Sequence, residues 1–330
     1  MYKFLQHKIF CVCLGEEFAS YPNVTVFDKG LYARPHGLAG WPYRLYEELH
    51  LDKKRWFTDW TNYIRDYDTI LMSDCARGTD VFRYIRKVHP GMRMIYYYVN
   101  SVLDHGYDYP PELKKYGVEL YTFDPKNAQE FGIRYKPFYY GRMGRRESSG
   151  QDITQDIFFV GKDKGRIHEL LQLKDALQRL GLSCHFVIKR TRRHCPYVGR
   201  EARETISSFL PYDDVCREIQ KSRAILDYVR PGQTGMTLRP YEALHFGKKL
   251  ITNNPWVKKE RFYRPENIFV FSGGTDWRSC RLFCKHRWFP SQRKKKRDMS
   301  PKSGWKSSFA EGGKRRAFCH YGNGRHARRA

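Results

Sequence analysis

The stretch 221–255, KSRAILDYVRPGQTGMTLRPYEALHFGKKLITNNP, constrains the fold of this chain more than any other segment. It is typical of a strand, a glycine-flanked loop, a helix and a second strand in succession. The short apolar run at 224–229 fits a buried strand, and the glycines after it fit a loop in which positive φ is tolerated. We expect the helix to begin after Thr237 as its N-cap and to end at Gly247.

The start of this predicted helix is suited to an anion. Pro240 falls in the first turn, where the missing N–H costs little. The free N–H groups of that turn and about half a positive charge from the helix dipole face the loop, so a nucleotide diphosphate fits there. Glu242 lies more than one turn into the helix, where we expect it to reach a ribose hydroxyl. The alternative is an ordinary strand–helix–strand unit in which Glu242 caps the helix or forms an ion pair.

The pattern PGQTGMTLRPYEALHFGKKLIT resembles the donor-binding domain of GT-B glycosyltransferases, above all bacterial enzymes of capsule and lipopolysaccharide assembly. The resemblance is strongest over residues 156–271. It implies that Glu242 holds the ribose of a sugar nucleotide and that the loop and helix start bind the diphosphate and the sugar. Retaining enzymes of this family often carry a second glutamate eight positions earlier, where this chain has Thr234, so the stereochemistry stays open. The residues implied in binding are Gln233, Thr234, Gly235, Met236, Thr237, Arg239 and Glu242.

Length and composition fit a protein of two domains. A chain of 330 residues suits two domains of roughly 140 residues each, and its 41% hydrophobic content is that of a folded protein. The nine cysteines are scattered and lie mostly in apolar runs, which predicts reduced thiols in a cytoplasmic protein. No apolar run approaches the ~18 residues of a membrane span. Peripheral contact with the inner face of the membrane is left open.

Strand-like and helix-like segments alternate through most of the chain, which predicts an α/β fold with parallel sheets. With the resemblance, this gives two Rossmann-like domains facing a cleft (GT-B). We expect an acceptor domain at 1–140, a polar glycine-rich linker at 141–154 and a sugar-nucleotide domain at 155–272. Within the first domain, we predict one aromatic amphipathic helix over 56–67.

Basic residues follow the first predicted strands of the second domain. Ligands of open parallel sheets lie beyond the carboxyl ends of the strands, so these residues should share a rim with the glycine-flanked loop. Cations there would neutralise a diphosphate leaving group; the alternative is that they are solvated surface charges. Tyr212 stands in a turn, 210–214, that resembles the family's base-binding turn, or the turn is a simple helix cap by Asp213. The predicted rim residues are Gly161, Lys162, Lys164, Lys189 and Arg190.

Other cofactor classes are disfavoured. Neither the dinucleotide fingerprint G-x-G-x-x-G nor the P-loop G-x-x-x-x-G-K-[ST] occurs. No acid-x-acid pair follows a predicted strand, so we expect no metal and no other cofactor. An inverting reaction needs a base that deprotonates the acceptor hydroxyl. The candidates are His36 and Asp74, with Asp28 as a third.

Residues 273–330 differ from the rest of the chain. They contain 17 Lys and Arg against 3 acids, which is more than half of the net charge of +26. We find neither helical nor strand periodicity in them and predict a disordered or irregular basic tail. One hypothesis is that the reading frame slips near 271–275, so that the tail is the product of a shifted frame. The alternative is an arm centred on 293–297 that binds nucleic acid or an anionic membrane.

The resemblance implies a metal-independent, hexosyltransferase-like glycosyltransferase. Such an enzyme would move a sugar from a nucleotide-sugar donor to a glycan or lipid-linked acceptor in cell-surface polysaccharide assembly. Two alternatives belong to other classes: a non-catalytic sugar-nucleotide-binding protein, and a basic nucleic-acid-binding protein acting through the tail. Nucleic acid is the disfavoured partner, and contact with an anionic membrane is left open. The sequence names neither the donor sugar nor the acceptor.

Overall fold

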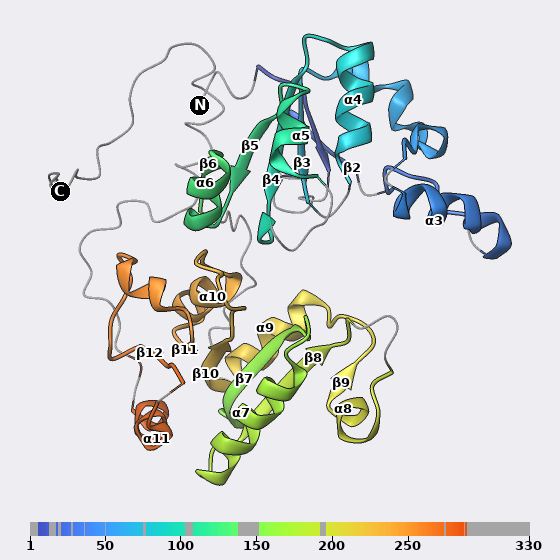
Figure 1. Cartoon of the computed structure of the whole chain (residues 1–330). Helices are drawn as coiled ribbons and strands as arrows, with labels where there is room; N and C mark the ends of the chain where they lie inside the picture. The colour runs from blue at the N-terminus through green and yellow to red at the C-terminus, as the bar shows by residue number, and fades with distance from the viewer. Residues whose placement is uncertain are drawn as a thin grey trace, which may run out of the picture.

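The chain forms two parallel six-stranded sheets, which lie in separate halves of the computed structural model (Figure 1). The strand order is β2-β1-β3-β4-β5-β6 in the first sheet and β12-β11-β10-β7-β8-β9 in the second. The residues that the structure describes are 6–12, 18, 21–27, 29–35, 37–49, 51–74, 77–102, 108–137, 152–191, 196–273, 275–286 and 288.

The first sheet and its helices fall within residues 1–140. Its strands are β1 Ile9–Val12, β2 Val24–Phe27, β3 Thr69–Ser73, β4 Arg93–Tyr98, β5 Glu119–Thr122 and β6 Arg134–Tyr135. Its α-helices are α3 Trp41–Glu48, α4 Thr79–Val88, α5 Pro110–Lys114 and α6 Pro125–Phe131. One 3-10 turn, η1 Gly37–Gly40, leads into α3.

Both faces of the first sheet are buried, as alternation along β3 shows. Ile70 and Met72 belong to the large core that also contains Phe82 of α4. Leu71, between them, belongs to a smaller core on the other face together with Phe123. Successive side chains of a strand point to opposite faces, so a strand covered on both sides reads as the continuous apolar run seen here.

The second sheet and most of its helices fall within residues 155–272. Its strands are β7 Gln155–Lys162, β8 Cys184–Lys189, β9 Thr205–Ile206, β10 Ser222–Asp227, β11 Lys249–Thr252 and β12 Ile268–Val270. Its α-helices are α7 Ile167–Arg179, α8 Gly199–Arg203, α9 Tyr212–Gln220, α10 Leu238–Phe246 and α11 Trp277–Lys285. One 3-10 helix, η6 Pro255–Lys259, follows β11.

Helices cover both faces of the second sheet. Helices α7 and α11 supply apolar side chains to the core on one face, and α9 and α10 supply them to the core on the other. Figure 1 shows α10 on the side of this domain that faces the first domain. The residues at the start of α10, Thr237, Leu238 and Arg239, line a pocket to which both domains contribute.

The predicted helix after the glycine-flanked loop is confirmed at both ends. The Thr237 hydroxyl caps α10 by accepting the N–H of Arg239 at 3.2 Å. Gly247 ends the helix with φ 64°, in the left-handed region that glycine enters at little cost. Lys248 then donates its N–H to the Ala243 carbonyl at 2.8 Å, which satisfies one of the last carbonyls of the helix.

The predicted aromatic helix at 56–67 is wrong. The structure has three short 3-10 turns there instead: η2 Lys54–Trp56, η3 Asp59–Asn62 and η4 Ile64–Asp66. Phe57 is extended because it forms a bridge with Tyr32, and the Trp60 indole donates to the Leu31 carbonyl at 3.0 Å. These contacts with the preceding segment override the local helical pattern.

The first part of the predicted irregular tail is also a correction. Helix α11 occupies 277–285, with Asp276 as its N-cap and with Cys280 and Cys284 buried against the second sheet. Trp277, Cys280 and Cys284 are spaced as on one face of a helix, but the many basic residues around them make this pattern hard to recognise in the sequence. The hypothesis of a reading frame that slips near 271–275 stays a prediction. Residues 289–330 lie outside the described residues, as does most of the predicted linker.

The predicted fold class, α/β with two Rossmann-like domains facing a cleft, is confirmed by the two parallel sheets and by a pocket lined from both of them. None of the helices that the structure describes combines the length and the apolar character needed to cross a membrane.

Candidate functional site

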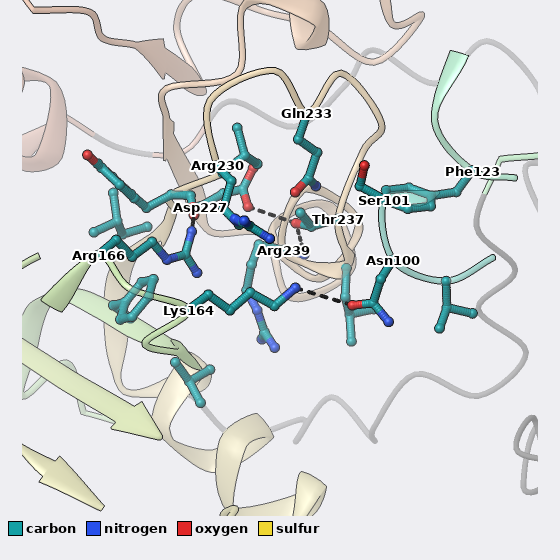
Figure 2. A pocket seen from close by; sticks show the side chains of 17 residues that line it. Asn100, Ser101, Phe123, Lys164, Arg166, Asp227, Arg230, Gln233, Thr237 and Arg239 are labelled. Carbon is teal, nitrogen blue, oxygen red and sulfur yellow. Dashed lines mark hydrogen bonds between the residues drawn. The ribbon is translucent and has the colours of Figure 1, made fainter. Parts of the chain in front are cut away.

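A cavity of about 250 Å³ lies between the two domains (Figure 2). We call it the interdomain pocket. The first domain contributes Asn100 and Ser101, which follow β4, and Phe123, which follows β5. The second domain contributes the segments after β7 and β10 and the start of α10. The pocket thus lies where the rule for open parallel sheets places a ligand, beyond the carboxyl ends of the strands.

Cationic side chains dominate the second-domain wall of this pocket. Lys164 and Arg166 come from the turn after β7, Arg230 comes from the loop after β10, and Arg239 lies in the first turn of α10. Asp227, at the end of β10, is the acidic residue that lines the pocket with them. The excess of positive charge, together with the start of a helix, makes this wall a site for an anion.

Arg166 is a partly buried member of this group. Its guanidinium donates to the carbonyls of Tyr228 and Lys162, the latter at 3.2 Å, and stacks over the Tyr228 ring at 5.6 Å. Burial lowers the pKa of the group. Within the part of the chain that the structure describes, its Nε is buried without a hydrogen-bond partner. An anionic oxygen in the pocket is the kind of group that would satisfy it.

Asp227 fixes the start of α10 to the end of β10. Its carboxylate accepts the Thr237 hydroxyl at 2.7 Å and the Thr252 hydroxyl at 3.0 Å, and burial raises its pKa. The Thr237 hydroxyl therefore bonds both to the strand end and to the N–H of Arg239 in the first turn of the helix. These bonds hold the helix start at the pocket.

Glu242 lies behind the pocket wall and does not line it. Its side chain is fully buried and accepts a hydrogen bond from the Arg239 guanidinium. Burial raises its pKa, and Arg239 and the Tyr212 hydroxyl oppose that rise. Among the described residues, its Oε1 has no hydrogen-bond partner. Burial raises the pKa of Tyr212, and the nearby charge of Glu242 raises it further. Glu242 and Tyr212, the residues predicted to bind the ribose and the base, are therefore neighbours.

The raised pKa of Glu242 predicts a pH dependence of stability. The folded protein holds this proton more tightly than the unfolded chain, so the free energy of unfolding falls as pH rises from the ordinary value of 4.5 through the raised pKa. Glu242→Gln does not titrate. We therefore expect the stability of wild type relative to Glu242→Gln to decrease with pH in that window, as measured by urea unfolding at a series of pH values. A difference that is constant or increases with pH would contradict this assignment.

The structure brings part of the predicted binding set together at the pocket. Gln233, Thr237, Arg239 and Lys164 line it. Met236 instead packs in the core of the second domain. Thr234 and Gly235 face the first domain, and Gly161 lies within β7.

The remaining rim residues take other places. The ammonium groups of Lys162 and Lys189 lie 5.4 and 5.2 Å from the centre of the Phe209 ring, which is 60% exposed. The Arg190 guanidinium donates to the Thr205 hydroxyl at 2.9 Å and to the Ala202 carbonyl at 2.8 Å. None of these three basic side chains lines the pocket. A shared sheet edge was therefore too coarse a criterion, because neighbouring loops along that edge turn their side chains in different directions.

Asp74 holds Asn100, one of the residues that line the pocket. Its buried carboxylate accepts the N–H of Val99 and the N–H of Asn100, both at 3.0 Å, and the Asn100 amide at 3.3 Å. The Oδ1 of Asn100 in turn accepts a hydrogen bond from the ammonium group of Lys164, in the second domain, at 3.2 Å (Figure 2). These contacts favour a positioning role for Asp74 over that of a base. The other candidate bases, His36 and Asp28, lie outside the described residues.

Sequence reasoning missed most of the residues that line the pocket, including four that carry a charge or an amide group. Arg166, Arg230, Asp227 and Asn100 all stand at the end of a strand or within four residues of it. The strand-end rule could have found them. Attention to the glycine-flanked loop directed the search to residues 233–242 instead.

Comparison with known proteins gives no family. No protein-family model and no curated protein matches the chain. Solved structures with a similar fold include a DNA-modifying β-glucosyltransferase (11% identity, 79% of this chain and 84% of that chain, TM-score 0.42). The lipopolysaccharide outer core galactosyltransferase WaaB aligns at 14% identity over 81% of this chain and 86% of that chain, with TM-score 0.41. The catalytic domain of starch synthase IV from Arabidopsis thaliana aligns at 10% identity over 82% and 74%, with TM-score 0.41. Because these identities and TM-scores are low, the function must be inferred from this chain's own residues.

Proposed function

We propose that this chain is a GT-B glycosyltransferase that binds a nucleotide-sugar donor in the interdomain pocket. The observation that carries the proposal is the convergence of Lys164, Arg166, Arg230 and Arg239 on the start of α10. A diphosphate offers these groups the anionic oxygens that bidentate guanidinium binding requires. The resemblance of the loop and helix to donor-binding domains supports the same ligand.

The volume of the pocket indicates which part of the proposed donor lies inside it. A volume of about 250 Å³ is close to the lower end, roughly 300 Å³, of pockets that enclose a whole small molecule. We therefore place the diphosphate and the sugar inside the pocket. The nucleoside would extend past Arg239 toward Tyr212, with its ribose at Glu242, whose Oε1 needs a donor. This placement keeps the role of Glu242 but requires Tyr212 or Arg239 to move when the ligand binds.

The chemistry of transfer follows from the charges. As the bond between the sugar and the diphosphate breaks, negative charge develops on the leaving phosphate. Guanidinium and ammonium groups that are already in place stabilise that charge without a metal ion. The first-domain wall, with Asn100 and Ser101, is the side from which we propose the acceptor hydroxyl approaches. We place the base in the first domain as well.

The finer features of the proposal rest on the sequence resemblance. They are a hexose donor, a glycan or lipid-linked acceptor, metal-independent transfer and a role in cell-surface polysaccharide assembly at the cytoplasmic side of the membrane. A non-catalytic sugar-nucleotide-binding protein would share the donor site but lack turnover.

A ligand screen followed by a product assay tests the proposal. We expect one of the UDP-, GDP-, ADP-, dTDP- or CMP-linked sugars to raise the melting temperature, and the matching free nucleotide to compete with it. Release of that nucleotide on addition of acceptor would establish an enzyme. Binding without turnover on any acceptor would favour the non-catalytic alternative, and no binding across the panel would contradict the proposal.

Variants of Asp74 and Asn100 distinguish a base from a positioning residue. If Asp74 acts through Asn100, then Asp74→Asn and Asn100→Ala should lower kcat/KM by similar factors, on the order of tenfold, without shifting the pH profile. A base removed by Asp74→Asn would instead cost ~10²–10⁴-fold, and Asn100→Ala would cost far less. Kinetics of both variants across pH separate the two outcomes.

A further inference from the structure

The carboxylate of Asp124 joins the two domains by accepting hydrogen bonds from both of them. It is the N-cap of α6 in the first domain, and its side chain is buried. Its Oδ1 accepts the N–H groups of Lys126 at 2.9 Å and Asn127 at 3.4 Å, which caps the helix. Its Oδ2 accepts the N–H groups of Thr234 at 2.8 Å and Gly235 at 3.0 Å, which belong to the second domain. Oδ1 thus caps the helix, and Oδ2 holds the two N–H groups of the loop before α10.

The contact between Asp124 and Thr234 is strengthened by the threonine hydroxyl. That hydroxyl donates to Oδ1 of Asp124 and accepts the N–H of Lys126 at 3.3 Å. Asn254 holds the other side of the loop, because its amide donates to the carbonyls of Thr234 at 3.4 Å and Gly235 at 3.3 Å. The loop is therefore pinned between the first domain and its own domain, and little freedom is left to its backbone.

Gly235 shows how closely the two domains approach. A Cβ at this position would lie 2.6 Å from ring carbons of Phe123 and 2.8 Å from the Phe123 carbonyl oxygen. Its φ is outside the left-handed region, so the backbone conformation does not require glycine. Close packing of the first domain requires it. Phe123 also lines the interdomain pocket, so this contact sets the position of one pocket wall.

We propose that Asp124 is an interdomain lock, which positions the first-domain wall of the pocket on the loop before α10. The carboxylate occupies two N–H groups of the loop that the resemblance implies in binding the diphosphate and the sugar. It follows, if the proposed function holds, that the donor phosphates are bound by the guanidinium groups and by the N–H groups further along the helix start. The lock itself does not depend on which ligand the pocket takes.

Asp124→Asn tests the lock because it separates the two oxygens. Asparagine is a good N-cap, so its oxygen can keep the bonds to α6. Its NH₂ group then faces the N–H groups of Thr234 and Gly235, where Oδ2 accepted them. We expect hydrogen exchange in peptides covering 234–235 to accelerate at least tenfold, while peptides covering 125–131 keep their protection. Asp276→Asn is the matched control, because Asp276 caps α11 within one domain, accepting the Arg278 N–H at 3.0 Å. Unchanged exchange at 234–235 would overturn the proposal.

Gly235→Ala tests the same contact by size instead of charge. The added methyl group cannot fit against Phe123, so we expect the domains to separate, with a larger radius of gyration in X-ray scattering and faster exchange at 234–235. Gly91→Ala is the control, because no neighbouring heavy atom comes within 4 Å of its added Cβ. Scattering and exchange identical to wild type would refute the lock. Neither readout involves a ligand, so failure here is distinct from failure of the proposed function.

Discussion

Arg239→Met is expected to lower the free energy of unfolding by about 3–5 kcal/mol at pH 8, the usual cost of removing one partner of a buried ion pair. Arg239 pairs with Glu242, whose side chain has no exposed surface. Arg239 lowers the pKa of Glu242 against the effect of burial, so without the guanidinium the buried carboxyl must at pH 8 either stay charged without its partner or take up a proton, and both cost folding free energy. The same change removes a cation from the pocket, so donor binding should weaken as well. Urea unfolding and calorimetric titration measure the two effects.

Two further variants make this result specific. Arg217 pairs with Asp214 at the same helical spacing, but both side chains are at least one-third exposed, so Arg217→Met should cost no more than about 1 kcal/mol. Adding Glu242→Gln to Arg239→Met removes the stranded charge and should recover much of the lost stability, but not the lost binding. Equal costs for Arg239→Met and Arg217→Met would show that burial of the pair is not what matters.

Arg166→Met is expected to have the opposite profile. It should weaken binding of a nucleoside diphosphate by about 10- to 100-fold, or ~1.4–2.8 kcal/mol, because charge-assisted hydrogen bonds are lost. The free energy of unfolding should change by no more than about 1 kcal/mol. Methionine fills similar space, and a guanidinium whose pKa is lowered by burial contributes little to stability in the empty pocket.

Arg190→Met is the matched control for Arg166→Met. Arg190 also donates to a backbone carbonyl and stacks 5.6 Å from a tyrosine ring, that of Tyr197, but it does not line the pocket. It should leave nucleotide affinity unchanged. If Arg190→Met weakened binding as much as Arg166→Met, the rim predicted from sequence would be right and the pocket described here would be wrong.

The local parts of the fold were predictable because their signals are local. Thr237 and Gly247 mark the two ends of α10 by capping chemistry that depends on a few adjacent residues. Likewise, the alternation of strand-like and helix-like segments predicted parallel sheets, because each segment can be recognised from its own residues. Helix α11 was missed because its two buried positions, Cys280 and Cys284, stand among basic residues that dominate the composition.

Features that depend on contacts between distant residues were not predictable. The segment 56–67 breaks into turns because Phe57 bridges to Tyr32, and nothing in its own pattern shows that bridge. The burial of Glu242 behind Arg239 depends on how the domain packs around α10, and the role of Glu242 at a ribose stays a prediction. Likewise, the partners of Asp124 in the second domain are more than 100 positions away in the sequence.

A crystal structure of the protein with a bound nucleoside diphosphate is the most direct measurement of the central claim. We predict that the two phosphates lie in the interdomain pocket, within hydrogen-bond distance of Arg166 and Arg230 and next to the first turn of α10, while Asp124 keeps its bonds to Thr234 and Gly235. Phosphates bound outside the pocket, for example between Lys162, Lys189 and Phe209, would contradict it.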